Sequence, residues 1–384
     1  MDGVHQLDRG PHTTPAVSLR ERVAALLDRT GALATAIQIR RMAPVPTVSI
    51  ITYHRIAEVA AGEPYDPDVV DATPAQFRRQ IEMLVRTGTP IGMTALIRAL
   101  DGAPLPPNPF MVTFDDGYLS CRDVALPILR ALGVPATFFI ATEYAGGRKL
   151  YWWEQIAVAL HRARRRIATL SYPTPMVVEA GDPRARGLLN SKVKNTRGLD
   201  LDRFLRELRA ALDVPWSPDI EAELAAQLCM TWRDIQALAD ERMDVESHTR
   251  THRVLETLDE HELQDELVSS RLELELALRR PVRALAYPVG RRPPARVRRA
   301  VAEAGYQIGL TNLGGVNRIR RTAVRVWPID RFDLCRLRTE RSQSDAMFLA
   351  QIAVPQLASM HGLLPRFPAR KAPRLEPIDA RGLE

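Results

Sequence analysis

Short apolar runs alternate with amphipathic segments along most of the chain. The segments between the runs have apolar residues at helical spacing, as after Thr73, a good helix cap that is followed by Pro74. Strands that alternate with helices indicate parallel βαβ units, and about seven such units close most naturally into a barrel. We therefore predict an α/β barrel with strands in TVSIITYHRI (47–56), PFMVTF (109–114), PATFFI (135–140), MDVES (243–247), VRALAY (282–287), YQIGLT (306–311) and VRVWPI (324–329).

Three segments depart from this alternation. Residues 1–46 include a basic stretch from Ser18 to about Arg41, where we expect one amphipathic helix that packs on the barrel or lies on a membrane surface. Within a barrel region of residues 47–342, a polar and partly helical stretch at about 143–230 is interpreted as an insertion on the functional face. Residues 343–384 are expected to form a helix and a tail rich in Pro and Arg.

The composition narrows the class of protein. Hydrophobic residues make up 46% and charged residues 26%, which is ordinary for a globular protein with a substantial core. Arginine patches carry most of the net charge of +7, and we interpret them as solvated faces, with no nucleic acid expected as a partner. No signal-peptide core and no run of about 20 apolar residues is visible, so we expect a cytoplasmic protein that contacts an anionic membrane peripherally at most.

Polar side chains stand at or just after the carboxyl ends of three of the expected strands. His54 follows the first strand, the pair Asp115–Asp116 follows PFMVTF within the segment TFDDG, and the segment SHTRTH places His248 and His252 after MDVES. Residues at the carboxyl ends of barrel strands meet at one face, where barrel enzymes carry their active sites. We therefore expect these five side chains to lie close together.

The combination of two His and two adjacent Asp indicates a metal site. Two His four residues apart with one carboxylate form an open site for a divalent ion, and such a site accepts zinc, cobalt, nickel or iron. A metal also relieves the repulsion between neighbouring carboxylates, and the Asp that is not a ligand is free to act as a base. This chemistry is metal-assisted hydrolysis of an amide or ester; a common strand-to-turn DDG and a structural His pair are the alternatives.

The segments TFDDG, SHTRTH and LAYPVG resemble the motifs of the polysaccharide deacetylases, carbohydrate esterase family 4, over about residues 48–331. The resemblance implies a distorted (β/α)7 barrel and removal of N-acetyl or O-acetyl groups from sugars with zinc or a similar divalent ion. By motif position it implies that Asp115 is the general base. It also implies that Asp116, His248 and His252 are the metal ligands.

The third motif departs from the family. Ala286 stands where many members have the arginine that holds the base Asp, and Val289 stands where an aromatic residue is frequent. In the family, the backbone amide at the position of Val289 helps to bind the oxyanion, and a backbone donor does not depend on the side chain. Tyr287 and Pro288 are expected to shape the pocket floor. Two arginines, Arg250 and Arg291, are weak candidates to replace the missing one.

The general acid is a second departure, because no late LxH motif is present. A subset of the family, similar to biofilm poly-N-acetylglucosamine deacetylases, places that His on the first strand, and His54 in ITYHRI fits this position. Asp330 in WPID is a candidate to hydrogen-bond His54 and to raise its pKa. Trp152 and Trp153 in YWWEQI either stack on sugar rings or form ordinary core.

These observations lead to three hypotheses of function. The first is a metal-dependent hydrolase, with zinc the favoured ion, that removes N-acetyl groups from an N-acetylhexosamine glycan or glycan precursor. The second is a barrel that binds a glycan without catalysis, and the third is a deacetylase of a small N-acetylated metabolite. The complete set of Asp115, Asp116, His248 and His252 favours an enzyme, because a binding protein has no need of a spare base.

Overall fold

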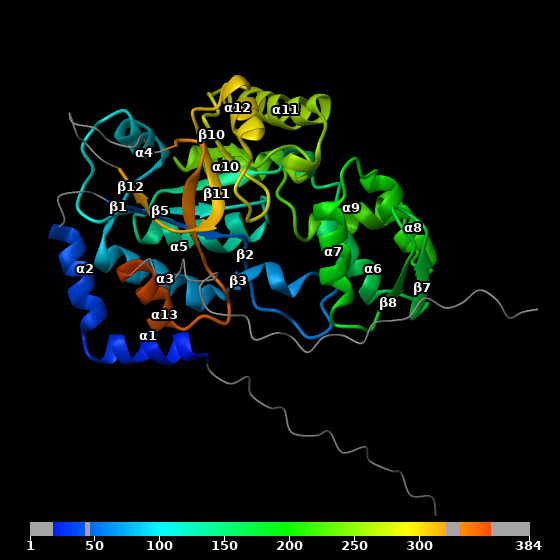
Figure 1. The fold of residues 1–384 in the computed structure, drawn as a ribbon, viewed down its shortest axis with the longest axis horizontal. Coiled ribbons are helices and arrows are strands. Elements are labelled where there is room, and N and C mark those ends of the chain that lie inside the picture. Colours follow the sequence, from blue (N-terminus) through cyan, green and yellow to red (C-terminus); the bar gives the residue numbers. More distant parts are fainter. Residues whose placement is uncertain (1–17, 43–46, 320–329, 355–384) are drawn as a thin grey trace, which may run out of the picture.

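Seven parallel strands close a barrel at the centre of the molecule, and the predicted distorted (β/α)7 barrel is confirmed. The computed structural model describes residues 18–42, 47–319 and 330–354 (Figure 1). Around the barrel the strands run in the order β1 (Thr47–Tyr53), β5 (Pro109–Phe114), β6 (Ala136–Ile140), β9 (Asp244–Ser247), β10 (Ala284–Ala286), β11 (Ile308–Gly314) and β13 (Leu334–Arg338). Parallel pairing of β13 with β1 completes the ring. Two short strands, β4 (Thr89–Pro90) and β12 (Asn317–Arg318), extend its edges.

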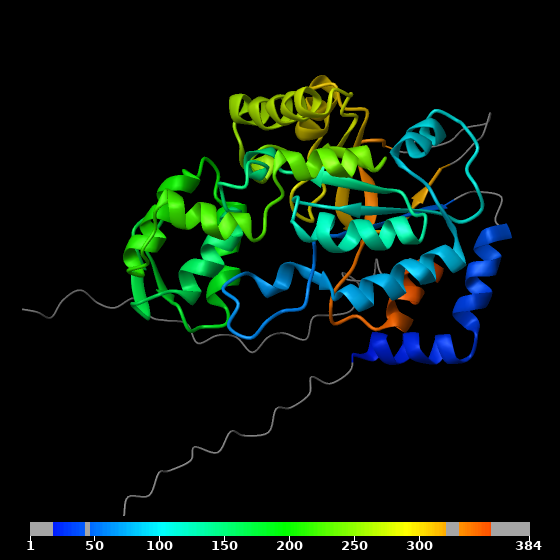
Figure 2. The ribbon, with the colours of Figure 1, turned by 180° about the vertical axis from the view of Figure 1, so that it is seen from behind.

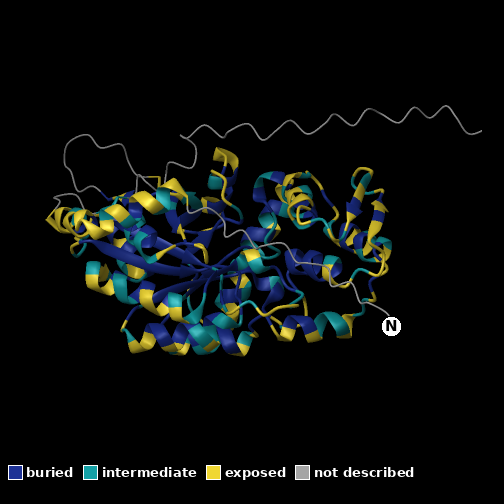
Figure 3. Cartoon of the chain, turned by 90° about the horizontal axis from the view of Figure 1, so that it is seen from below, coloured by how far each residue is buried: buried dark blue, intermediate teal, exposed yellow. Residues whose placement is uncertain are grey.

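The barrel strands are buried on both faces, which explains their nearly continuous apolar sequences. Every residue of β5 and of β6 is buried. Figure 3 shows the buried strands surrounded by helices whose outer faces are exposed. The helices outside the barrel are α3 (Pro74–Thr87), α4 (Met93–Leu100), α5 (Leu126–Ala131), α10 (Trp232–Asp240), α11 (Glu260–Leu278) and α12 (Ala295–Glu303). The predicted helix start at Thr73 is present as a capping box with Gln76, which satisfies the first backbone N–H groups of α3.

The seventh strand of the barrel differs from the prediction. The segment VRVWPI lies outside the described residues, and the strand between β11 and β1 is instead β13, with the sequence LCRLR. Its Arg336 is fully buried inside the barrel. A strand with two arginines in five residues does not look buried by sequence, because an arginine is fully buried only where it is paired.

The basic N-terminal segment forms two helices rather than the single one expected. Helix α1 (Leu19–Arg29) and helix α2 (Ala32–Met42) are separated by Gly31, which has a φ of +74° that glycine adopts without steric cost. Both pack on α13 (Asp345–Ala353) beside the barrel (Figure 1). The shared cluster contains Ala24, Leu33, Ile37, Met347, Ala350 and Ala353.

A group of helices and a small hairpin lies beside the barrel, in the region expected to be an insertion (Figures 1 and 2). It contains α6 (Trp152–His161), β7 (Ile167–Leu170), β8 (Met176–Glu179), α7 (Ala185–Asn195), α8 (Leu201–Ala211) and α9 (Pro218–Ala226). A second small sheet, of β2 (Arg55–Ile56) and β3 (Val70–Ala72), follows β1. Within the described part of the chain, each helix is too short or too polar to cross a lipid bilayer.

Candidate metal and catalytic site

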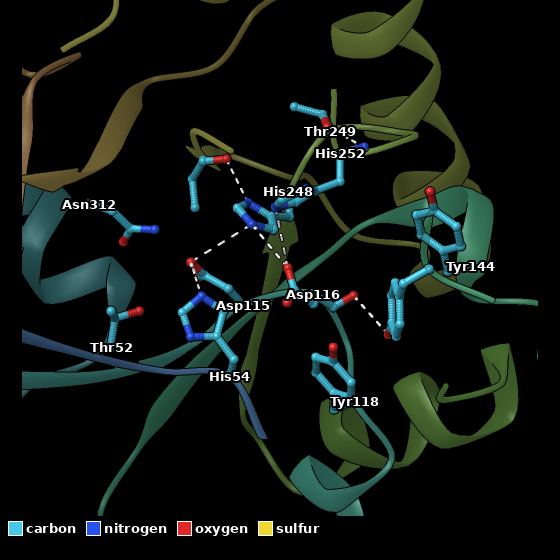
Figure 4. Close-up of polar contacts among 12 residues, drawn as sticks. Thr52, His54, Asp115, Asp116, Tyr118, Tyr144, His248, Thr249, His252 and Asn312 are labelled. Atoms are coloured by element: carbon cyan, nitrogen blue, oxygen red, sulfur yellow. Dashed lines mark hydrogen bonds and ion pairs between the residues drawn. The ribbon is translucent and has the colours of Figure 1, made fainter. Parts of the chain in front are cut away.

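The five predicted side chains converge at the carboxyl end of the barrel (Figure 4). His54 directly follows β1, the pair Asp115–Asp116 directly follows β5, and His248 directly follows β9, with His252 in the loop beyond. The side-chain atoms that can act as ligands in Asp116, His248 and His252 lie within 4.8 Å of one another. Parallel pairing of neighbouring strands brings their ends to the same face, as the sequence pattern predicted.

The three candidate ligands are positioned so that their ligand atoms could bind one cation. The Nε2 atoms of His248 and His252 lie 3.4 Å and 3.5 Å from Oδ1 of Asp116. Nδ1 of His248 is 2.8 Å from the carbonyl oxygen of Ala286, so this nitrogen carries the proton and Nε2 presents its lone pair to the site. Oδ1 of Asp116 is buried and forms no hydrogen bond with any described residue. Two imidazoles and a buried, unpartnered carboxylate oxygen fit a divalent ion.

The candidate ligand His252 is held neutral, which is the form that can bind a metal ion. Burial, the largest influence, lowers the pKa of its imidazole to about 3, and the opposing attraction of Asp116 is smaller. An imidazole without a proton on the ligating nitrogen has a lone pair available at neutral pH.

Left-handed backbone conformations cluster at this site. Asp116, Thr249, His252 and Val289 have φ angles of 73°, 66°, 57° and 63°. Such angles are uncommon outside glycine and costly for a β-branched residue, and they concentrate at functional sites. At Asp116 the change of conformation ends the strand, and it allows the carboxylates of two consecutive residues to face the same site despite the alternation of a strand.

The loop that carries His252 is fixed by a residue that the sequence did not single out. Glu266 on α11 is buried, and one of its oxygens accepts the backbone N–H groups of both Arg250 and Thr251 at 2.8 Å. Its other oxygen accepts the hydroxyl of Thr251. Because these bonds hold the turn between the two histidines, Glu266 positions the ligand set without touching it.

Asp115 is held by an arginine from β13, which lies on the other side of β1 from β5. Two guanidinium nitrogens of Arg336 each lie 2.7 Å from one of the two carboxylate oxygens. Arg336 also donates to the carbonyl oxygen of Thr311 and to Oδ1 of Asn312. Burial works to raise the pKa of Asp115, but the charge of Arg336, aided by His248, outweighs it and lowers the pKa well below its usual value. The carboxylate is therefore ionised and fixed in orientation.

The two arginines expected to hold Asp115 lie elsewhere, and this prediction was wrong. Arg250 pairs with Glu143 and Asp265, and Arg291 pairs with Glu256. Proximity in sequence to the two motifs suggested them, whereas the barrel brings in an arginine more than 200 residues from Asp115.

His54 is held by Asp71 rather than by Asp330, so that prediction was also wrong. Nδ1 of His54 lies 2.9 Å from Oδ2 of Asp71, on β3, while Asp330 pairs with Arg298. Burial works to lower the pKa of His54, but the charge and hydrogen bond of Asp71 raise it to about 9. Its other nitrogen, Nε2, lies 3.9 Å from Asp115, and the side chain is 23% exposed. His54 is therefore a protonated imidazole that a bound molecule can reach.

The remaining predicted residues occupy two kinds of position. Trp152 and Trp153 begin α6 and are almost entirely buried, although both border the cleft, and Trp153 packs against the ring of His252 with centroids 4.6 Å apart. Val289 also lines the cleft. Tyr287 and Pro288 line a smaller hollow that shares Val289 with the cleft, and the hydroxyl of Tyr287 donates to the carbonyl oxygen of Phe332.

A cleft of about 500 Å³ opens at the carboxyl end of the barrel. Barrel residues, among them His54, Asp116 and His252, form one wall, and helix α7 forms the other. A larger hollow of about 720 Å³ lies between α6, α8 and the loop after β9, and it contains none of these three residues. The candidate site therefore opens into the smaller cleft.

Comparisons with known proteins agree with this geometry. The family model described as polysaccharide deacetylase matches residues 102–179 and 214–309. None of the curated proteins matches the chain. The fold is similar to that of the Streptococcus pyogenes deacetylase PplD in complex with acetate, with a TM-score of 0.53 and 18% identity over 80% of this chain and 99% of that one.

It is also similar to BC0361, a polysaccharide deacetylase from Bacillus cereus, with a TM-score of 0.50 and 17% identity over 80% of this chain and 69% of that one. The matched residues contain Asp115, Asp116, His248 and His252, the residues that form the predicted site. The motifs, the barrel and the family model agree, and the chain therefore belongs to the polysaccharide deacetylase family.

Proposed function

We propose that the chain is a metal-dependent de-N-acetylase of an N-acetylhexosamine glycan or glycan precursor. The observation that carries the proposal is that the set of Asp116, His248 and His252 lies beside Asp115, a carboxylate that Arg336 keeps ionised. A divalent ion at this set, zinc first among the candidates, would supply Lewis acidity that activates water and polarises an acetamide carbonyl. The subset of the family with its acid on the first strand is part of the same proposal.

Two protein residues carry out the two proton transfers of the proposed hydrolysis. Asp115 takes a proton from the attacking water as the new C–O bond forms at the acetamide carbon. His54, protonated through Asp71, then gives a proton to the nitrogen as the C–N bond breaks, which releases acetate and a free amine. The Nε2 atom of His54 and the carboxylate of Asp115 are 3.9 Å apart, a separation that suits an acid and a base acting on one reacting group.

The backbone amide of Val289 is the proposed oxyanion donor. Its left-handed conformation places a backbone turn at the edge of the cleft, and no described residue accepts a hydrogen bond from its N–H. A free, fixed N–H beside the metal set can stabilise negative charge as it develops on the carbonyl oxygen.

Two alternatives are distinguished by experiment. A barrel that only binds glycan is disfavoured by Arg336, because a bidentate arginine that keeps Asp115 ionised supports a role in catalysis. A small N-acetylated metabolite would occupy the same cleft. Acetate release is measured with zinc- or cobalt-loaded protein on chitooligosaccharides and on UDP-N-acetylglucosamine, against Asp115→Asn. Metal-dependent release that the substitution abolishes supports the proposal, and no release from metal-loaded protein contradicts it for these sugars.

We also propose that α1 contacts an anionic membrane surface. Its outer face combines the exposed apolar residues Leu19, Val23 and Leu26 with the exposed arginines Arg22 and Arg29. A face of this kind can lie at the boundary between headgroups and acyl chains.

A further inference from the structure

We propose that the cleft takes an N-acetylated sugar that carries a negatively charged group, a phosphate or a carboxylate, and that Lys194 and Arg338 bind this group. The inference rests on the proposed deacetylase function and specifies its substrate class. Lys194 comes from α7, and Arg338 is the last residue of β13, so the two cations border the cleft from opposite walls.

Helix α7 presents a polar stripe to the cleft. Its lining residues recur at helical spacing as Arg186, Gly187, Asn190, Ser191, Lys194 and Asn195. Residues four apart share a helix face, so one side of α7 lines the cleft. Leu189 and Val193 lie on another side of the helix and are buried. The side-chain oxygen of Asn190 is buried and forms no hydrogen bond with any described residue. A sugar hydroxyl is the kind of donor that would satisfy it.

Most charges that line the cleft are already paired within the protein. Arg186 lies 2.9 Å from Asp66 and also pairs with Asp68, which neutralises a large part of the acidic rim. Arg291 pairs with Glu256, and Asp71 pairs with His54. Because both members of each pair belong to the protein, their charges neutralise one another and attract a charged ligand only weakly.

Lys194 and Arg338 differ from these residues. Neither forms an ion pair within 4 Å among the described residues, although both border the cleft. Burial lowers the pKa of Lys194, and the charges of Asp116, a proposed metal ligand, and of Asp66, which Arg186 already holds, oppose this only in part. With a divalent ion on Asp116, the cleft has positive charge to spare, and an anionic ligand would complement it.

The segment that carries α7 lies outside the ranges that the family model matches. The family model matches residues on both sides, 102–179 and 214–309, but its matched ranges do not include 180–213. Arg338 also lies beyond the matched residues. The matched ranges contain Asp115, Asp116, His248 and His252, whereas Lys194 and Arg338 lie outside them, so the proposed selection among N-acetylated sugars rests on residues apart from the matched motifs.

Binding is tested with full-length Asp115→Asn protein, which holds the ligand without turnover. Calorimetry compares N-acetylglucosamine 1-phosphate, N-acetylmuramic acid and methyl N-acetylglucosaminide, which carry a phosphate, a carboxylate and no charge. We expect the better of the two anionic sugars to bind at least about tenfold more tightly than the neutral one, and the order of the two identifies the charged group.

Substitutions assign the preference to residues. Lys194→Gln and Arg338→Gln should each reduce the ratio of anionic to neutral affinity several-fold, and Lys194→Arg should restore most of it. The matched control is Lys192→Gln, because Lys192 lies on the same helix but donates to Thr174 outside the cleft. Equal affinity for the three sugars, or a preference that survives both Gln substitutions, overturns the inference.

Acetate release from the same three sugars with the unsubstituted protein separates this inference from the proposed function. Acetate release without any preference for the anionic sugars supports the proposed deacetylase function and overturns the proposal that Lys194 and Arg338 bind a negatively charged group. Preferential binding that depends on Lys194, without release from any of the three sugars, supports the subsite and counts against the catalytic proposal.

Discussion

The guanidinium of Arg336 and the carboxylate of Asp115 form two parallel hydrogen bonds of 2.7 Å, and both side chains are fully buried. Asp115 directly follows β5 and Arg336 lies on β13, and these two strands flank β1 on its two sides in the closed barrel. Arg336 orients the proposed base, a role that the residue at the position of Ala286 in the third motif cannot fill because it is not an arginine. The fold thus keeps a buried ion pair at the site while taking its cation from a different strand.

Replacing Arg336 tests this pairing. Arg336→Lys keeps a positive charge but loses the planar fork, so we expect kcat for acetate release to fall by about 100-fold while metal content is kept. Arg336→Ala should also lower the free energy of unfolding by about 3–5 kcal/mol, because it leaves the Asp115 carboxylate buried and unpaired. In the Asp115→Asn background the same change should cost much less stability, since no charge is left without a partner. An equal loss in both backgrounds would show that Arg336 acts on the fold and not through Asp115.

The pair of His54 and Asp71 predicts an alkaline limit to activity. Asp71 raises the pKa of His54 to about 9, so a required imidazolium is present at neutral pH and is lost as pH rises through that value. Asp71→Asn removes the charge that raises the pKa, and the alkaline limb of kcat should move to lower pH, toward the ordinary value of about 6.5. The control is Asp68→Asn, whose carboxylate lies at the cleft but pairs with Arg186. An alkaline limb that stays in place in Asp71→Asn contradicts the role of His54 as the acid.

Metal content separates the proposed ligands from the proposed base. Asp116→Asn and His252→Gln should each reduce zinc affinity by at least about 100-fold, because each removes one of three protein ligands. Asp115→Asn should retain zinc at the level of the unsubstituted protein and yet release no acetate. Elemental analysis after dialysis against a chelator buffer measures the difference. Loss of zinc in Asp115→Asn, or its retention in both ligand variants, would refute the assignment.

The exposed face of α1 predicts binding to anionic vesicles. Leu26 is 61% exposed, and Leu26→Ser should weaken sedimentation with phosphatidylserine vesicles by about threefold or more, because an apolar side chain no longer enters the bilayer. Leu276→Ser is the matched control, since Leu276 on α11 is 82% exposed on another helix. Equal binding by both variants and the unsubstituted protein would exclude this surface.

The barrel and its central site could be predicted from the sequence because their determinants are local. Apolar runs of strand length alternate with helical patterns, and Asp115, Asp116, His248 and His252 each follow such a run closely. Once the strands are parallel, their carboxyl ends share one face, so residues far apart in sequence meet without further information. The single helix expected before β1 was wrong because Gly31, which permits a left-handed turn, interrupts a continuous apolar spacing.

The residues that support the site could not be predicted in this way, because no sequence motif marks them and their role depends on contacts in the folded structure. Asp71 contacts His54 from a two-stranded sheet, Glu266 contacts the loop of His252 from the first turns of a long helix, and Arg336 contacts Asp115 from two strands away in the barrel. Each is an ordinary charged residue in its own segment. The sequence by itself determined the barrel and the candidate ligand set and base, whereas only the tertiary structure decided which buried charges neutralise one another, since burial pairs charges by distance in space and not along the chain.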